Sequence, residues 1–149
     1  MAKHFPIQTL IGLAQDDVDT AAQRLGRVQR DRNEVAAQLD ALVQYRDEYH
    51  SRFNASAQAG MPAGNVRNFQ AFIDTLDAAI EQQRKLLDTA NSRVEAAKPE
   101  WQRQKQKLGS YEVLKARGEA AEAKTVARRE QRDADEHAAR ILRMRAEGV

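Results

Sequence analysis

Ser56-Ala57-Gln58-Ala59-Gly60-Met61-Pro62-Ala63-Gly64-Asn65 is the stretch that decides the fold of this 149-residue chain. Two glycines and a proline among small and polar residues are typical of a chain reversal. Long segments with helical periodicity lie on both sides, so we expect two helices joined by a turn at about 56–65. Five of the eight aromatic residues lie near this turn: Tyr45, Tyr49, Phe53, Phe69 and Phe72.

A seven-residue repeat precedes the turn. One seam position holds Ile11, Val18, Leu25, Arg32, Leu39, Arg46 and Phe53, and the other holds Ile7, Ala14, Ala21, Val28, Val35, Leu42 and Tyr49. Twelve of these fourteen residues are apolar or aromatic, which indicates a coiled coil rather than an ordinary amphipathic helix. We expect a helix over about 6–55 that needs a partner along its whole seam.

A second repeat, after the turn, supplies that partner. Its seam residues are Phe69, Leu76, Gln83, Ala90, Ala97, Gln104 and Tyr111, with Ile73, Ile80, Leu87, Val94, Trp101 and Leu108. Folding back at the turn pairs Phe53 with Phe69 and places the small Ala21 opposite the large Trp101, as a close-packed seam requires. We therefore predict an all-α fold, a long two-helix antiparallel coiled coil (helical hairpin). Asn65 would cap its second helix, over about 66–146.

The second helix is predicted to outlast the first. Pro99 removes a backbone hydrogen bond, so we expect a kink near 99. Further on, large apolar residues are few until Ile141, Leu142 and Met144. We expect an overhanging C-terminal helix, whose apolar residues are either a solvated tail or a docking end. Residues 1–149 are interpreted as a single elongated domain.

Four seam positions are polar, namely Arg32, Arg46, Gln83 and Gln104. They either fix the register of the two helices or leave the coil soft enough for partners to repack it. Gly12 and Gly109 would fall nearly opposite each other. That position marks either a close approach of two backbones or a coincidence.

The composition argues against several classes of function. Net charge is +2 with acidic and basic residues interspersed, so no basic surface for nucleic acid is expected. Cysteine is absent and the three histidines are far apart in sequence; we find no catalytic, metal or cofactor motif and predict no enzyme. No apolar run is long enough for a membrane span or a cleaved signal, which leads us to expect a cytoplasmic protein.

The apolar face is wider beside the turn than the seam needs. Two rows share the spacing i, i+4, i+7, i+11: Gln38, Leu42, Tyr45 and Tyr49 before the turn, and Phe72, Leu76, Ala79 and Gln83 after it. Tyr45 and Phe72 fall beside the seam rather than in it. In an antiparallel hairpin the rows form one patch, which either binds a protein partner or thickens the packing of the tip.

Three motifs give the chain a resemblance to the FliJ family, the small coiled-coil proteins of the bacterial flagellar type III export apparatus. They are the Tyr45…Tyr49 row, the segment Asn68-Phe69-Gln70-Ala71-Phe72…Leu76, and the charged run ending in Asp135-Glu136-His137-Ala138-Ala139-Arg140. Their order and spacing match over essentially the whole chain. Injectisome stalk proteins of the YscO type are similar in architecture, but the motifs favour a flagellar setting.

The resemblance implies a non-enzymatic stalk without a cofactor, similar to the central stalk of rotary ATPases. It implies binding to a hexameric FliI-like export ATPase, whose ring assembly and activity the stalk promotes. It also implies binding to an FlhA-like export-gate membrane protein and to export chaperones. The chain would then lie at the cytoplasmic face of the inner membrane, held there through partners only.

By matching position, the resemblance places the gate contact on Gln38, Leu42, Tyr45, Tyr49, Phe72, Leu76 and Ala79. The ATPase would face the opposite end, where we expect Ile141, Leu142 and Met144 to contribute. Two other classes of function stay open. One is a structural coiled coil that self-assembles, against which the internal turn argues. The other is a hairpin chaperone that grips clients with its aromatic tip.

Overall fold

The fold is all-α and is built from two long helices that pack against each other. The computed structural model describes residues 6–148, in which α1 spans Ile7–Gln58 and α2 spans Ala63–Glu147. No strand occurs in this described part of the chain. The predicted helical hairpin is therefore confirmed, and both helices begin and end within a few residues of the expected positions.

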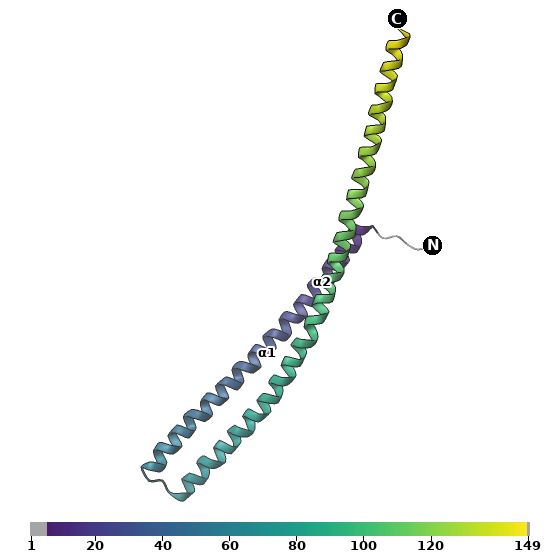
Figure 1. The fold of residues 1–149 in the computed structure, drawn as a ribbon. Coiled ribbons are helices and arrows are strands. Elements are labelled where there is room, and N and C mark those ends of the chain that lie inside the picture. The colour runs from purple at the N-terminus through teal and green to yellow at the C-terminus, as the bar shows by residue number, and fades with distance from the viewer. Residues whose placement is uncertain (1–5, 149) are drawn as a thin grey trace, which may run out of the picture. The chain divides into compact units, whose positions relative to one another are not determined.

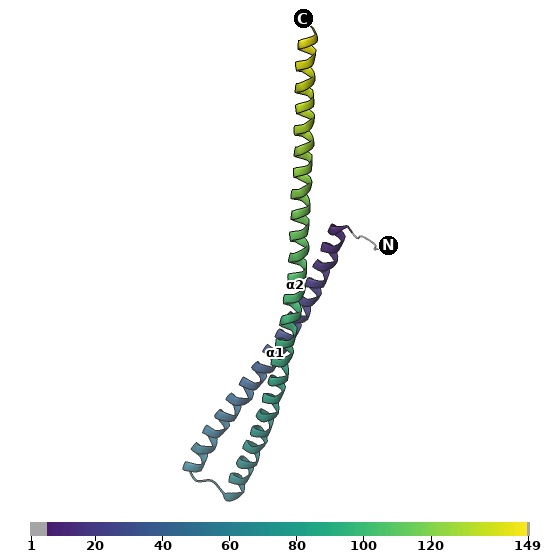
Figure 2. The ribbon, with the colours of Figure 1, turned by 45° about the vertical axis from the view of Figure 1, so that its right-hand side comes forward.

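Contacts divide the described chain into two compact units. The hairpin unit is Asp17–Gln104, and the terminal unit comprises residues 6–16 and 105–148. In the hairpin unit, α1 and α2 run side by side in opposite directions from the turn that joins them, in both views (Figures 1 and 2). The antiparallel arrangement brings the two halves of the aromatic-rich sequence together at the turn end.

The core of the hairpin unit follows the predicted seam. Its buried side chains are Ala21, Ile73, Leu76, Ile80, Ala90, Val94 and Ala97. Each occupies a seam position of the seven-residue repeat. Ile73, Ile80 and Val94 are only 2%, 1% and 1% exposed, and burying an aliphatic side chain of this size stabilises a fold by about 1.5–3 kcal/mol. Burial of the narrow seam thus accounts for why these two helices pair.

The predicted register is supported by contacts across the hairpin. The rings of Phe53 and Phe69 pack with centroids 5.6 Å apart, as expected from the pairing. Ala21, placed opposite Trp101 by the same register, is 7% exposed. A small residue facing a large one lets the helices stay close without leaving a void.

The polar seam residues are half-buried rather than fully enclosed. Arg46 Nη1 lies 3.4 Å from Asp77 Oδ1 across the helices, and Gln104 Nε2 donates to Glu100 Oε1 at 3.1 Å. An arginine can cover apolar surface with its stem while its guanidinium reaches water. The charge of Arg46 is therefore paired where it interrupts the apolar seam, and Arg32 donates through Nε to Asn33 Oδ1 at 3.1 Å.

The turn is shorter than predicted, because both helices extend into the stretch expected to form it. Within the predicted turn of 56–65, only residues 59–62 are non-helical. Gly60 has φ +91°, a left-handed conformation that glycine adopts without steric cost. The Asn65 and Val66 amides donate to the Pro62 carbonyl at 3.0 and 3.2 Å. Asn65 consequently lies inside α2, and its predicted role as the N-cap is wrong.

Pro99 lies inside α2, which continues through it. A proline at this position cannot donate its own backbone hydrogen bond, yet neighbouring Val94 and Ala97 are buried in the seam. Packing against α1 thus holds the segment helical. The predicted bend at this residue stays a prediction.

The terminal unit pairs only the start of α1 with α2. The Thr9 and Leu10 amides donate to the Pro6 carbonyl at 2.9 and 3.2 Å, so Pro6 precedes the first helical residue. Lys115 Nζ donates to Gln8 Oε1 at 2.8 Å. From residue 116 to residue 148 every described side chain is exposed, which confirms an α2 extension without a partner.

The two glycines of the terminal unit do not mark a close approach of the helices. A Cβ atom added to Gly12 or to Gly109 would meet no other atom within 4 Å. An alanine would therefore fit at either position. Their opposite placement has no packing role in this structure.

Candidate functional site

Five aromatic rings form a cluster at the turn end of the hairpin unit. We call Tyr45, Tyr49, Phe53, Phe69 and Phe72 the tip cluster. Tyr49 is at its centre, with its ring centroid 4.6 Å from Phe72 and 5.0 Å from Phe69. Aromatic pairs at such distances contribute about 0.5–1.5 kcal/mol beyond the area they bury. The cluster therefore fixes the two helix ends against each other.

Two members of the tip cluster reach the surface. Tyr45 is 46% exposed and Phe72 is 37% exposed. Their rings meet in a T-shaped arrangement, with centroids 6.2 Å apart and planes at 82°. Large exposed aromatics that are already rigidly held suit a protein-binding surface, because little side-chain entropy is lost when a partner covers them.

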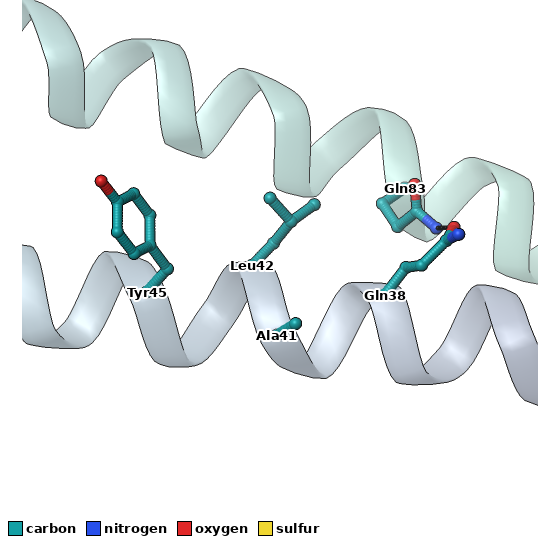
Figure 3. A pocket seen from close by; sticks show the side chains of 5 residues that line it. All are labelled: Gln38, Ala41, Leu42, Tyr45 and Gln83. Carbon is teal, nitrogen blue, oxygen red and sulfur yellow. Dashed lines mark hydrogen bonds between the residues drawn. The ribbon is translucent and has the colours of Figure 1, made fainter.

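A hollow adjoins the tip cluster on its side away from the turn. Gln38, Ala41, Leu42 and Tyr45 of α1 line it together with Gln83 of α2, and its volume is about 400 Å³ (Figure 3). The α1 residues stand on one helical face. Such a hollow has room for one or two side chains of a partner.

One side chain of α2 bridges to α1 at the far end of this hollow. Gln83 Nε2 donates to Gln38 Oε1 at 3.0 Å and to the Val35 backbone carbonyl at 3.2 Å (Figure 3 shows the first of these bonds). We call this pair of hydrogen bonds the Gln83 clasp. It joins residues that are 45 and 48 positions apart in the chain, so it forms only when the hairpin is closed.

The seven residues expected to bind the gate partner lie together, but they do not share one environment. Gln38, Tyr45 and Phe72 are exposed, whereas Leu42, Tyr49 and Ala79 are half-buried. Leu76 is 7% exposed and belongs to the core. A buried side chain supports a surface rather than touching a partner. The accessible part of the patch therefore centres on Gln38, Tyr45 and Phe72.

Two features of the site go beyond the two sequence rows. Ala41 lines the hollow although it belongs to neither row. Its position three residues after Gln38 puts it on the same helical face, and this spacing could have identified it from the sequence. Arg46 and Asp77 form an ion pair between the helices beside the cluster. Asp77 follows the seam residue Leu76 and is not itself a seam position. The repeat therefore does not predict its contact with Arg46, which only the side-chain geometry shows.

The terminal unit presents a second apolar surface. Ile141, Leu142 and Met144 are 39%, 66% and 65% exposed, which confirms that they have no cover within the described chain. Nearer the start of α1, a hollow of about 440 Å³ is lined by Ile7, Gln8, Leu114, Lys115, Gly118, Glu119 and Glu122. The lining of this hollow combines apolar side chains with acidic and basic ones.

Neither unit shows the features of a metal site or of a membrane span. Within residues 6–148, no group of three or more His, Asp or Glu side chains is placed to hold a metal ion. Neither of the described helices has a stretch long and apolar enough to cross a bilayer.

The chain is similar to known proteins along nearly its whole length. The family model described as "Flagellar FliJ protein" matches residues 3–147. Flagellar FliJ proteins of Salmonella typhi and Escherichia coli (strain K12) are 35% and 33% identical to this chain, over 99% of the chain and 100% of each relative. A putative YscO homologue from Chlamydia trachomatis shares 16% identity at a TM-score of 0.46, over 98% of this chain and 99% of the other.

Proposed function

This chain belongs to the flagellar FliJ family, and from that premise we propose that it is a non-enzymatic stalk and adaptor of the flagellar type III export apparatus. The observation that carries the proposal is the exposed aromatic pair at the turn end, Tyr45 with Phe72. A hairpin that offers aromatic surface at one end has the form of a part that docks onto another protein. Its chemistry is recognition, and no catalytic step is assigned to it.

The tip binds the export gate in this proposal. Tyrosine is among the residues that most often dominate the binding energy of interfaces, and Tyr45 is held in place by Tyr49 and Phe72. The partner is an FlhA-like membrane protein. Binding to it brings the chain to the cytoplasmic face of the inner membrane, through the partner rather than through a segment of its own.

The extended part of α2 binds the export ATPase. Exposed Leu142 and Met144 supply apolar contacts, and the surrounding mixed charges suit a ring of similar but not identical sites. A stalk promotes assembly and activity of a FliI-like hexamer by binding one state of the ring more tightly than another. Export chaperones are a third class of partner, to which we assign no residues.

The decisive experiment measures ATP hydrolysis and hexamer formation by the cognate export ATPase with and without this protein. We expect both to rise when the protein is added. A protein that leaves both unchanged is not a stalk of the export ATPase. Binding of the gate's purified cytoplasmic domain, followed by calorimetry, tests the adaptor half of the proposal separately.

A hairpin chaperone is the alternative that the tip also suits, because the Gln38–Tyr45 hollow and the exposed aromatics could hold an unfolded client. That function predicts suppression of client aggregation without any effect on the ATPase. A self-assembling structural coiled coil predicts an obligate dimer or a filament instead. Light scattering tests the self-assembling coiled coil, which would be a dimer or filament, whereas the stalk and the chaperone both act as a closed hairpin monomer.

A further inference from the structure

The Gln83 clasp occupies a place in the seam where an apolar residue would pack better. Gln83 is a seam residue whose neighbours in the repeat, Ile80 and Leu87, are both apolar, and Ile80 is 1% exposed. A polar seam residue lowers the stability of a coiled coil and is retained where it specifies an arrangement. The question is which arrangement Gln83 specifies.

The hydrogen bonds fix the orientation of two amide groups. The two oxygens near Gln83 Nε2 are the Val35 carbonyl at 3.2 Å and Gln38 Oε1 at 3.0 Å. Both are acceptors, so the nitrogen of Gln83 must face them. With its oxygen occupied in this way, Gln38 keeps its own Nε2 group as a donor.

Gln38 stands at the edge of the hollow that Leu42 and Tyr45 also line. A glutamine on an exposed helix face ordinarily samples many rotamers, and ordering it on binding costs conformational entropy. The clasp holds the Gln38 amide in one orientation in this structure. The hollow is therefore bordered at one end by the hydrogen-bonded amide of Gln38 and at the other by the ring of Tyr45 (Figure 3).

We infer that Gln83 is a positioning residue for the partner surface, which holds Gln38 so that its amide donates to a hydrogen-bond acceptor on the bound protein. The acceptor is a backbone carbonyl or a side-chain oxygen beside an apolar group that enters the hollow. Gln83 itself does not touch the partner. This inference rests on the proposed function, because the partner surface is the one assigned to the gate.

If Gln83 had only a structural role, replacing it would lower the stability of the hairpin and its affinity for the partner together. If Gln83 positions Gln38, a replacement can lower the affinity without lowering the stability. Gln83→Met keeps the length of the side chain but removes both donors. Because methionine suits an apolar seam, we expect the thermal midpoint of the variant to stay the same or rise. Affinity for the gate's cytoplasmic domain should nevertheless fall by about three- to tenfold, the effect of having to order one glutamine side chain on binding.

The test is a double-mutant cycle with Gln38→Ala, measured by calorimetry on the full chain. We expect Gln83→Met to weaken binding in the wild-type background and to have no further effect in the Gln38→Ala background. Gln82→Met is the matched control, since Gln82 is exposed on the same turn of α2, and it should change neither quantity. Equal losses in both backgrounds would show that Gln83 contacts the partner directly and would overturn the inference, as would unchanged binding by Gln83→Met.

A second measurement is independent of the gate. The ¹H–¹⁵N signals of the Gln38 side-chain amide should report an ordered group in the wild-type chain and a mobile one in Gln83→Met. A Gln38 amide that is equally mobile in both proteins overturns the inference. If the wild-type chain does not bind the gate, the proposed function fails, and this NMR comparison still decides whether Gln83 holds Gln38.

Discussion

The ring of Tyr45 on α1 meets the ring of Phe72 on α2 nearly at right angles, with planes at 82° and centroids 6.2 Å apart. The two residues approach each other only because the chain reverses between them. Both are also among the exposed large apolar residues of the hairpin unit. The surface that we assign to a partner is thus assembled from both helices, and it exists only in the closed hairpin.

Replacing both rings should weaken the partner surface and leave the fold intact. For Tyr45→Ala with Phe72→Ala, we expect affinity for the export gate's cytoplasmic domain to fall by about 10- to 100-fold, as for central aromatic residues of other interfaces. Helicity measured by circular dichroism should stay nearly unchanged, because both residues lie beside the seam. Leu86→Ala, at a residue 46% exposed on α2, is the control. A large loss of helicity would show that the two rings are core.

The register can be tested by disulfide trapping, which has no background in a chain without cysteine. Ala21→Cys with Trp101→Cys should cross-link readily under mild oxidation, since the register places these residues opposite each other. Ala21→Cys with Val94→Cys is shifted by one heptad and should not cross-link. Efficient trapping of the shifted pair alone would contradict the register.

The seam should account for most of the stability of the hairpin. Ile80→Ala removes a side chain that is 1% exposed, and the cavity it leaves should lower the free energy of unfolding by about 2–5 kcal/mol. Leu86→Ala on the same helix should change it by no more than about 0.5 kcal/mol. Urea denaturation followed by circular dichroism measures both. Similar losses for the two variants would mean that burial in the seam is not the main source of stability.

Arg46 offers a test of the polar seam positions. Its side chain is 26% exposed and its partner Asp77 is 52% exposed, so the ion pair should contribute about 0–1 kcal/mol. Arg46→Leu exchanges that pair for apolar contacts, and we expect the thermal midpoint to stay the same or rise. Salt should lower the midpoint of the wild-type chain more than that of the variant. A pronounced fall in the midpoint would show that the guanidinium is needed to hold the seam.

The end of α2 should matter for the ATPase and not for the hairpin. Replacing Ile141, Leu142 and Met144 with serine removes exposed apolar side chains, so the midpoint of hairpin unfolding should not change. Stimulation of the export ATPase, measured by phosphate release, should be largely lost. Serine at Ala134, Ala138 and Ala139 on the same helical stretch is the control. Full stimulation by the first variant would remove these three residues from the ATPase contact.

The seam of the fold was predictable from the sequence because a heptad repeat states both which face is buried and how far the helix runs. Among residues 6–148, every buried side chain, from Ala14 to Ala97, lies at a predicted seam position. The limits of the turn were not predictable to the same accuracy. Alanine and glutamine at 57–59 are good helix formers, and a helix tolerates Gly64 and Asn65 in its first turn. The local composition therefore suits either state, and packing decides between them.

The sequence predicted which two rows of residues form the site, but it did not predict the contacts between their side chains. Spacing placed Tyr45 and Phe72 beside the seam, where the structure has them exposed. Spacing placed Leu76 both in the seam and in the surface row, and burial decides for the seam. Spacing could not show that Gln83 bonds to Gln38, because that contact depends on side-chain rotamers and on the exact separation of the helices. Such details follow from three-dimensional packing, for which a one-dimensional period carries no information.

Gly60 is the one described residue with a positive φ, and the reversal of the chain depends on it. A residue with a Cβ atom there raises the energy of the closed turn without changing the seam. An extended α1–α2 connection would let α1 of one molecule pair with α2 of another through the same contacts, giving a domain-swapped dimer. A substitution at Gly60 should therefore shift the balance from one hairpin toward an exchanged pair, and the size of that shift should depend on protein concentration.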